Sequence, residues 1–227
     1  LIALEREGLI RIELNRGGID VHHTVAKEFS RGLLEDPNIE LVCDEGRSAL
    51  MRDPERYDIV QMTGIDTWTS LASGAYVLAE NYLYTVEAVR LMYEHLRDGG
   101  LLQITRMGAE PEKLRLLVNV MQAFRELGVP DIAPSVAVVT APIDELTAVV
   151  VKKGAFTEAE VASLEAFADR AGHYKTYLPR RTLDGNVVEY FVKLAPDAKD
   201  AFIRDFELRH KRLYPQASAE KLESLRH

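Results

Sequence analysis

The sequence of 227 residues contains one cysteine, Cys43, and one tryptophan. A single cysteine excludes a disulfide within the chain and favours a reducing compartment, so we expect a cytoplasmic protein. No apolar run approaches the roughly 18 residues of a membrane span, and no signal peptide is recognisable. Cys43 ends a predicted buried strand, which indicates a small core residue rather than a nucleophile.

An excess of positive charge is also absent. The chain has 36 acidic and 28 basic residues, a formal net charge of −8. Nucleic-acid binding needs a basic stripe, so we expect no nucleic-acid partner. Hydrophobic residues make up 47% of the chain, which is enough for one sizeable core.

Metal-binding patterns are scarce too. His22 and His23 are adjacent, and adjacent residues of a helix point about 100° apart. No third ligand follows at a suitable spacing. We therefore predict no metal site.

Residues 56–106 organise the prediction of the fold. An apolar run at 57–62 indicates a buried strand, and the periodicity of residues 73–96 indicates a helix. Asp98-Gly99-Gly100 is a helix stop, and residues 101–105 form a second buried strand. Two buried strands joined by a helix predict a parallel sheet.

The flanking segments continue this alternation. Before the crossover we predict a helical segment at 1–7, a strand at 9–14, a helix at 21–34, a strand at 39–43 and a helical turn at 49–52. After it we predict a helix at 111–127, strands at 136–140 and 146–151, a helix at 157–171, a strand at 174–178, a strand or part of a lid at 186–194 and a short helix at 197–206. The fold class is therefore α/β, with a doubly wound, mostly parallel sheet that finishes in an antiparallel hairpin.

The domain organisation follows from the same pattern. Residues 1–153 are predicted to form a Rossmann-like nucleotide-binding domain, and residues 154–227 a small α/β appendage with a tail. The connector between the strands at 136–140 and 146–151 is too short for anything but an antiparallel hairpin. Thr157 and Glu160 form a capping box, which predicts the start of the helix that follows.

Acidic residues follow three predicted strands. Glu13 ends one strand, Asp44-Glu45 follow the next, and Asp66 comes after the strand at 57–62. The carboxyl ends of parallel strands meet at one edge, so these acids can converge on one cleft. A carboxylate after the second strand suits ribose hydroxyls, and one after the third suits an exocyclic amine. A single such acid is equally well interpreted as a solvated loop residue.

Several short segments, taken in order, resemble the spermidine synthase-like proteins. These are Rossmann-type enzymes that use S-adenosylmethionine or its decarboxylated form. The resemblance covers roughly residues 1–178. It lies in Glu13-Leu14-Asn15, Asp44-Glu45-Gly46-Arg47-Ser48, Tyr57-Asp58-Ile59-Val60-Gln61, Asp66-Thr67-Trp68 and Ala79-Glu80-Asn81-Tyr82-Leu83-Tyr84-Thr85.

The resemblance implies a set of site residues and a reaction. Aminopropyl transfer from decarboxylated S-adenosylmethionine to a small amine is the implied activity, as in polyamine biosynthesis. Asp66 would orient the amine and take up its proton. Cofactor binding is implied for Glu13 on the ribose, for Asp44 or Glu45 on the adenine, and for Gly46 and Thr63. Trp68, Tyr82 and Tyr84 are implied as substrate-binding residues, although aromatics at helical spacing also suit a core.

Two departures from the family pattern keep alternatives open. Thr63 stands where polyamine synthases place the first of two aspartates, and the Gly-rich loop with its aspartate is not found. We expect that a segment carrying that loop precedes Leu1. A methyltransferase using S-adenosylmethionine and a non-catalytic binding or assembly domain are the alternatives. A homodimer is compatible with the sequence, which decides neither the acceptor nor the oligomeric state.

Overall fold

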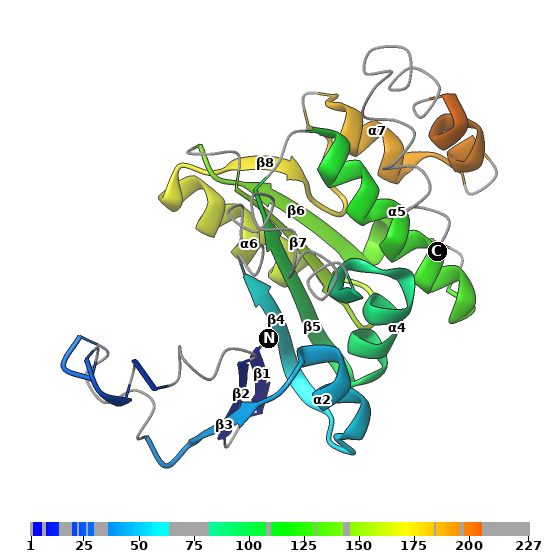
Figure 1. The fold of residues 1–227 in the computed structure, drawn as a ribbon. Helices are drawn as coiled ribbons and strands as arrows, with labels where there is room; N and C mark the ends of the chain where they lie inside the picture. Colours follow the sequence, from blue (N-terminus) through cyan, green and yellow to red (C-terminus); the bar gives the residue numbers. More distant parts are fainter. Residues whose placement is uncertain are drawn as a thin grey trace, which may run out of the picture.

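An eight-stranded sheet in the order β3-β2-β1-β4-β5-β7-β6-β8 forms the centre of the molecule (Figure 1). The structure is a computed structural model. It describes residues 2–5, 8–13, 20–21, 23–25, 27–29, 36–63, 82–107, 110–129, 131–142, 146–183, 185–195 and 198–205.

The predicted parallel strands are confirmed. β2 (Gly8–Glu13) pairs in parallel with β3 (Ile39–Cys43), and β4 (Tyr57–Thr63) pairs in parallel with β5 (Leu96–Arg106). All four run in the same direction, so their carboxyl ends lie at one edge of the sheet, where ligands bind in open α/β sheets.

The first strand corrects a prediction. β1 (Ile2–Glu5) falls within the segment predicted to be helical, and it pairs antiparallel with β2 on one side and with β4 on the other. A short apolar run fits either a helix or a strand by its periodicity. Pairing on both sides satisfies the backbone groups of this segment, which decides for the strand.

The carboxyl-terminal part of the sheet is antiparallel. β6 (Val136–Thr140) and β7 (Thr147–Lys152) form the predicted hairpin, and β7 pairs with β5. β8 (Tyr174–Tyr177) is the additional predicted strand and pairs outside β6. The hairpin therefore lies one strand in from the edge at which it was predicted.

The glycines before residue 101 belong to a strand and do not end a helix. β5 already begins at Leu96, and Gly99 has a backbone φ of +80°, a value that residues other than glycine rarely adopt. A Cβ at Gly100 would lie 2.9 Å from the Arg97 carbonyl oxygen. The glycines thus serve an irregular start of β5 that packs close to its neighbouring backbone.

The crossover helix is shorter than predicted. α4 (Val86–Glu94) begins after Thr85, whose hydroxyl accepts a hydrogen bond from the Ala88 N–H, and the 3₁₀-helix η3 (Tyr82–Tyr84) precedes it. The extended conformation of Thr85 ends any continuous helix there. Residues 73–81 of the predicted helix lie outside the described residues.

The remaining helices follow the predicted pattern with one correction. α2 (Gly46–Arg52), α5 (Glu110–Glu126) and α6 (Glu158–Ala171) occupy predicted helical regions, and both bonds of the Thr157–Glu160 capping box are present. Residues 198–205 are helical, as predicted.

The correction concerns residues 186–194, which are neither a strand nor a lid. They form α7 (Val187–Lys193), capped by the Asn186 side chain, which accepts from the Glu189 N–H. Of the helix predicted at 21–34, Asp20, Val21 and His23 are helical and residues 24–25 and 27–29 are turns. The rest of that helix and the tail from residue 207 lie outside the described residues.

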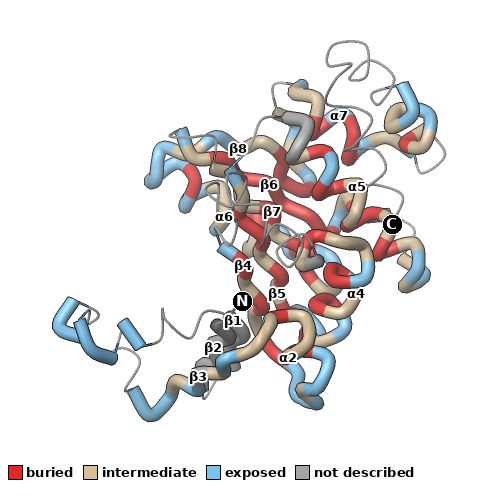
Figure 2. The backbone as a smooth tube through the Cα atoms, in the orientation of Figure 1, coloured by how far each residue is buried: buried red, intermediate tan, exposed pale blue. Residues whose placement is uncertain are grey.

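The core lies between the sheet and its helices. Buried side chains of α4, α5 and α7 pack on one face of the sheet, and α6 packs on the other through a smaller cluster (Figure 2). The largest fully buried residues include Tyr57, Phe124, Phe191, Met92 and Ile104. β8 and α7 share this sheet and core, while the predicted division into domains after residue 153 stays a prediction.

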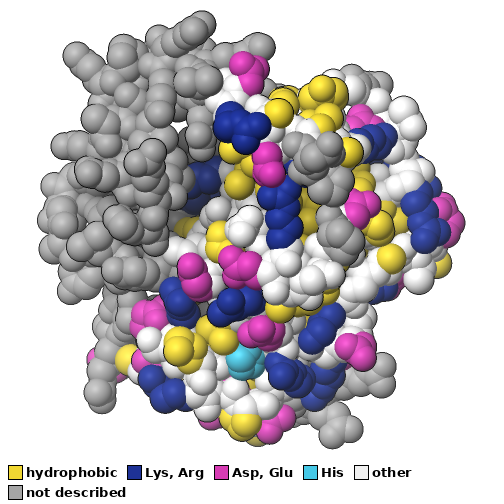
Figure 3. All heavy atoms as spheres, turned by 90° about the vertical axis from the view of Figure 1, so that its right-hand side faces the viewer, with side chains coloured by type: hydrophobic (Ala, Val, Ile, Leu, Met, Phe, Trp, Pro, Cys, Tyr) yellow, Lys and Arg dark blue, Asp and Glu magenta, His cyan; other side chains and the backbone are white. Residues whose placement is uncertain are grey.

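The outer surface carries mixed charge. On the helical face seen in Figure 3, basic and acidic side chains are interspersed. Pairs such as Arg90–Glu126 and Arg125–Asp200, at 3.2 and 2.9 Å, are examples of this mixture. Within the described part of the chain, no helix has the length and apolar character needed to cross a membrane.

Candidate functional site

The carboxyl edge of the parallel strands brings three predicted cofactor positions into one row. Glu13 lies opposite Cys43, the residue before Asp44, and Thr63 lies opposite Thr105. β1 separates the two pairs of strands, and Ile2 is level with both Arg11 and Gln61. Glu13 is two residues after Arg11, and Thr63 is two residues after Gln61, so the two residues end their strands at the same height. Because one strand, β1, separates β2 from β4, their backbones are roughly 10 Å apart.

Asp44 is a half-buried acid at this edge. One of its carboxylate oxygens, Oδ1, accepts from the Glu45 N–H at 2.8 Å, and Oδ2 pairs with the Arg52 guanidinium. The Arg52 side chain is 65% exposed. An exposed pair of this kind contributes little to stability, so a ligand can replace Arg52 at low cost.

Glu45 has a structural role that the sequence analysis did not separate from that of Asp44. It is the N-cap of α2, and its two carboxylate oxygens accept from the Arg47 and Ser48 N–H groups at 2.9 and 2.8 Å. A cap of this kind is worth about 0.5–2 kcal/mol. Because both oxygens serve the cap, Asp44 is the acid of the pair that is better placed to meet a ligand.

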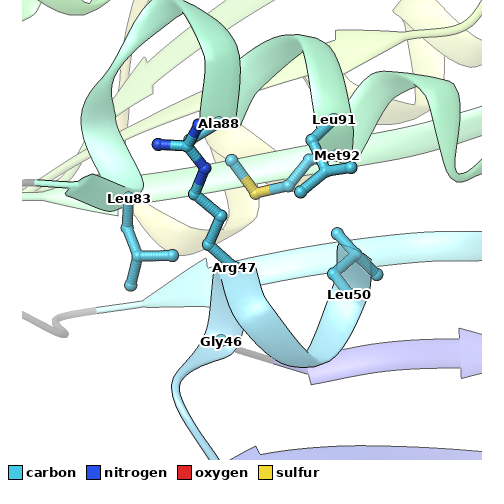
Figure 4. A pocket seen from close by; sticks show the side chains of 7 residues that line it. All are labelled: Gly46, Arg47, Leu50, Leu83, Ala88, Leu91 and Met92. Atoms are coloured by element: carbon cyan, nitrogen blue, oxygen red, sulfur yellow. The ribbon is translucent and has the colours of Figure 1, made fainter. Parts of the chain in front are cut away.

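A small hollow lies beside these acids, between α2 and α4 (Figure 4). Its volume is about 170 Å³, including space open to solvent. The lining residues are Gly46, Arg47, Leu50, Leu83, Ala88, Leu91 and Met92. The lining side chains leave no room even for a water molecule between them, so a nucleotide base does not fit into the hollow as it stands.

The hollow is apolar inside and charged at its rim. Leu50 and Met92 are buried, whereas Arg47 is half-buried and extends its guanidinium past Ala88 (Figure 4). The pKa of the nearby Glu87 is lowered, first by a hydrogen bond from its own backbone, then by the Thr85 hydroxyl, and less strongly by the charge of Arg47. The buried Gly46 leaves room at the mouth of this hollow, since it has no side chain.

Thr63 ends β4 as an exposed residue. Its hydroxyl accepts from the Gln61 side-chain amide at 3.0 Å, and the neighbouring β5 repeats this arrangement with Gln103 and Thr105. Register places each of these residues opposite its counterpart. Asp66 and Trp68, the predicted catalytic and substrate-binding residues, follow Thr63 in the chain and lie outside the described residues.

Tyr84 of η3 lies next to the same edge, in contact with Arg106. Tyr84 is buried, with 8% of its surface exposed, and its carbonyl oxygen accepts from the Asn119 side chain at 2.6 Å. The guanidinium carbon of Arg106 lies 4.2 Å from the centre of its ring. Tyr82 is the first residue of the same 3₁₀-helix. The implied role of both tyrosines in substrate binding stays a prediction.

Sequence analysis missed Arg106. It is the last residue of β5 and half-buried at the same edge as Thr63. The signal was present, because a charged residue ending a buried strand is the criterion that selected Glu13 and Asp44. That criterion was applied to acids alone.

The interpretation of Cys43 as a core residue is wrong, because its side chain is exposed. β3 is the edge strand of the sheet, and an outer strand buries less than a central one. In the described part of the chain, no group of three or more His, Cys, Asp or Glu residues could hold a metal ion.

Comparison with known proteins shows what the chain is similar to. No protein-family model matches the chain. Over 95 residues the chain is 27% identical to polyamine aminopropyltransferase 2 of Pseudomonas aeruginosa, a match that covers 42% of this chain and 25% of that protein. The match thus spans a quarter of the length of this curated relative.

Solved structures show the same likeness. A probable spermidine synthase from Corynebacterium glutamicum superimposes with a TM-score of 0.51 at 16% identity, covering 82% of this chain and 61% of that one. The spermidine synthase from Thermotoga maritima gives a TM-score of 0.47 at 17% identity, covering 68% and 48%. The chain therefore has the spermidine synthase-like fold of class I methyltransferases, as its sequence predicted.

Proposed function

We propose that this chain forms the nucleotide-binding part of a transferase that moves an aminopropyl group from decarboxylated S-adenosylmethionine to an amine. The observation that carries the proposal is the row of Glu13, Asp44 and Thr63 along one sheet edge. The sequence match to a polyamine aminopropyltransferase supports the same class of reaction.

The residues present fit an adenosine donor. Glu13 ends β2, where a carboxylate can accept from both ribose hydroxyls. Asp44 can accept from the adenine amine once it exchanges Arg52. Glu45 holds the first turn of α2 in place for this contact.

The donor supplies an activated carbon beside its sulfonium, and the acceptor nitrogen takes that carbon with release of methylthioadenosine. The nitrogen must be neutral to attack, and it must lose a proton after the new bond forms. Asp66 is proposed to accept this proton, three residues after the end of β4. The net charge of −8 would help to attract a cationic amine.

Methyl transfer from S-adenosylmethionine is the second candidate. The observation that favours it is Thr63, which offers a hydroxyl at the end of β4 where a polyamine pocket would offer a second acid. Both candidates use the same nucleotide contacts, so the products of the reaction distinguish them. A domain that binds nucleotide without catalysis is the third outcome.

Calorimetry with the protein at its natural length tests the nucleotide site. We expect methylthioadenosine and decarboxylated S-adenosylmethionine to bind, and Glu13→Gln and Asp44→Asn each to weaken binding about tenfold or more, because each removes a hydrogen bond to a charged group. Glu40→Gln is the matched control, since Glu40 is an exposed acid of the same strand, β3, away from its carboxyl end.

The outcomes separate the parts of the proposal. Undetectable binding of methylthioadenosine, S-adenosylhomocysteine and both sulfonium donors at millimolar concentration would contradict the nucleotide site as a whole. An unchanged affinity in Glu13→Gln alone would contradict the ribose contact. A larger loss in Glu45→Gln than in Asp44→Asn, at equal helix stability, would assign the adenine contact to Glu45.

A further inference from the structure

Arg106 places a positive charge at the carboxyl edge of the sheet. It is the carboxyl-terminal residue of β5, immediately after Thr105, which lies opposite Thr63 in the parallel register. Neighbouring strands are about 4.8 Å apart, so Arg106 begins one strand away from the segment that leads to Asp66.

The guanidinium is held in a defined position. Its central carbon lies 4.2 Å from the centre of the Tyr84 ring, in cation–π geometry. Tyr84 is itself buried, and the Asn119 side chain of α5 donates to its carbonyl oxygen. Arg106 is half-buried, so the ring supports one side of the guanidinium while part of the side chain remains accessible.

The chemistry of this group selects a particular kind of ligand. An arginine stays protonated in proteins, and its planar fork of donors matches a carboxylate with two parallel hydrogen bonds. Its five N–H donors allow it to serve more than one partner. A polyamine offers only cationic or neutral amines and no carboxylate that an arginine could bind through two parallel hydrogen bonds.

We propose that Arg106 binds the carboxylate of a substrate at the carboxyl end of β5. The inference rests on the proposed transferase function and names the ligand chemistry of the same cleft. An alkyl carboxylate can come from two sources there. It is either the carboxylate of S-adenosylmethionine, which the decarboxylated donor lacks, or a carboxylate on the amine acceptor.

The experiment has one arm for each source and uses the protein at its natural length. The donor arm measures the affinities of S-adenosylmethionine and decarboxylated S-adenosylmethionine by calorimetry. The acceptor arm compares 5-aminopentanoate with putrescine. The first has a carboxylate where the second has an ammonium group, at the same distance from the reacting amine. Acceptor affinity is measured with and without methylthioadenosine, and transfer is followed as a second readout.

Three variants test the residue. Arg106→Gln removes the charge, Arg106→Lys keeps the charge without the fork, and Arg97→Gln is the control because Arg97 lies at the opposite end of β5 and pairs with Asp58 at 3.0 Å. We expect Arg106→Gln to weaken the carboxylate-bearing ligand about tenfold or more, with its carboxylate-free counterpart within about twofold. Arg106→Lys should recover part of the loss, and Arg97→Gln should change neither ligand.

Each result has a consequence. If Arg106→Gln weakens only the binding of S-adenosylmethionine, Arg106 binds the carboxylate of the donor. If it weakens only the binding of 5-aminopentanoate, Arg106 binds the carboxylate of the acceptor. Equal loss of both members of each pair, or no loss in either arm, would overturn the inference. A chain that binds no adenosine compound contradicts the proposed function, whereas 5-aminopentanoate binding measured alone still decides the role of Arg106.

Discussion

The part of the chain that carries the first site residues and the part that carries the core differ in burial. Among residues whose burial the structure describes, from Asp20 onward, none before Gly46 is buried. In contrast, β6 is buried along its whole length (Figure 2). Leu117, Val120 and Phe124 of α5 are buried as well. Among the residues whose burial is described, the hydrophobic stabilisation therefore comes mainly from the later part of the chain.

The difference has a structural cause. β6 and β7 are covered by α5 and α7 on one face and by α6 on the other, so their side chains are buried on both faces. β3 is an edge strand whose Glu40 and Cys43 are exposed. The carboxyl end of β3 is thus exposed at Cys43, and substitutions there should affect function more than stability.

The largest expected effect is on the rate of the reaction, at a residue whose substitution should leave stability unchanged. We expect Asp66→Asn to lower the rate of single-turnover transfer to an amine about 10²–10⁴-fold, because it removes the proton acceptor while keeping the shape of the side chain. Nucleotide affinity and the urea midpoint should change little. The measurement compares wild type and variant with putrescine and with longer amines. A rate within about threefold of wild type would contradict the role of Asp66 as a base.

The next largest effect is on the free energy of unfolding, at a core residue away from the proposed site. Phe124 of α5 is fully buried, and its ring centre lies 4.9 Å from that of Tyr93. We expect Phe124→Ala to lower the free energy of unfolding by about 3–5 kcal/mol, from lost burial and the cavity left behind. Urea unfolding measures this change.

Phe29 provides the matched control in the earlier part of the chain. It is 90% exposed, so Phe29→Ala should change the free energy of unfolding by less than about 0.5 kcal/mol. If the two substitutions destabilised the protein equally, the proposed contrast between the two parts of the chain would be wrong.

The smallest effect concerns acid stability of the later part. The pKa of Glu160 is lowered from 4.5 to about 2, first by the hydrogen bond from Lys152, then by the backbone N–H of Thr157. Because the pKa is lower in the folded protein, the ionised Glu160 contributes fully to the free energy of unfolding above pH 4.5, and this contribution is lost as the pH falls toward 2. Stability should therefore decline over this interval.

Glu160→Gln should make that decline shallower, because the neutral side chain cannot titrate. The measurement is the urea midpoint as a function of pH, with Glu55→Gln as a control at an exposed acid outside the capping box. Because the Glu160 side chain is 43% exposed, solvent screening keeps the effect small. Identical pH profiles for Glu160→Gln and wild type would show that Glu160 contributes nothing.

Local signals in the sequence were sufficient for several elements. Thr157 and Glu160 predicted the start of α6, and the short connector after residue 140 predicted the hairpin of β6 and β7. Acids at strand ends predicted the edge at which Glu13, Asp44 and Thr63 are placed. Each of these signals depends on residues close together in the chain or on a rule of sheet topology.

The tertiary structure alone decided the features that depend on distant partners. Residues 2–5 form a strand because β2 and β4 pair with them, and Cys43 is exposed because no strand pairs outside β3 among the described residues. Which acid of the Asp44-Glu45 pair caps a helix depended on where α2 begins.

The position of Arg106 over Tyr84 joins residues from β5 and η3 that no sequence pattern connects. The sequence by itself thus determined most of the strands and helices, though not β1 and α7, and the chemistry available at their ends, because propensity, capping and turn geometry act over a few residues. The fold decided which of those groups meet, because strand pairing and side-chain packing join segments that are far apart in the chain.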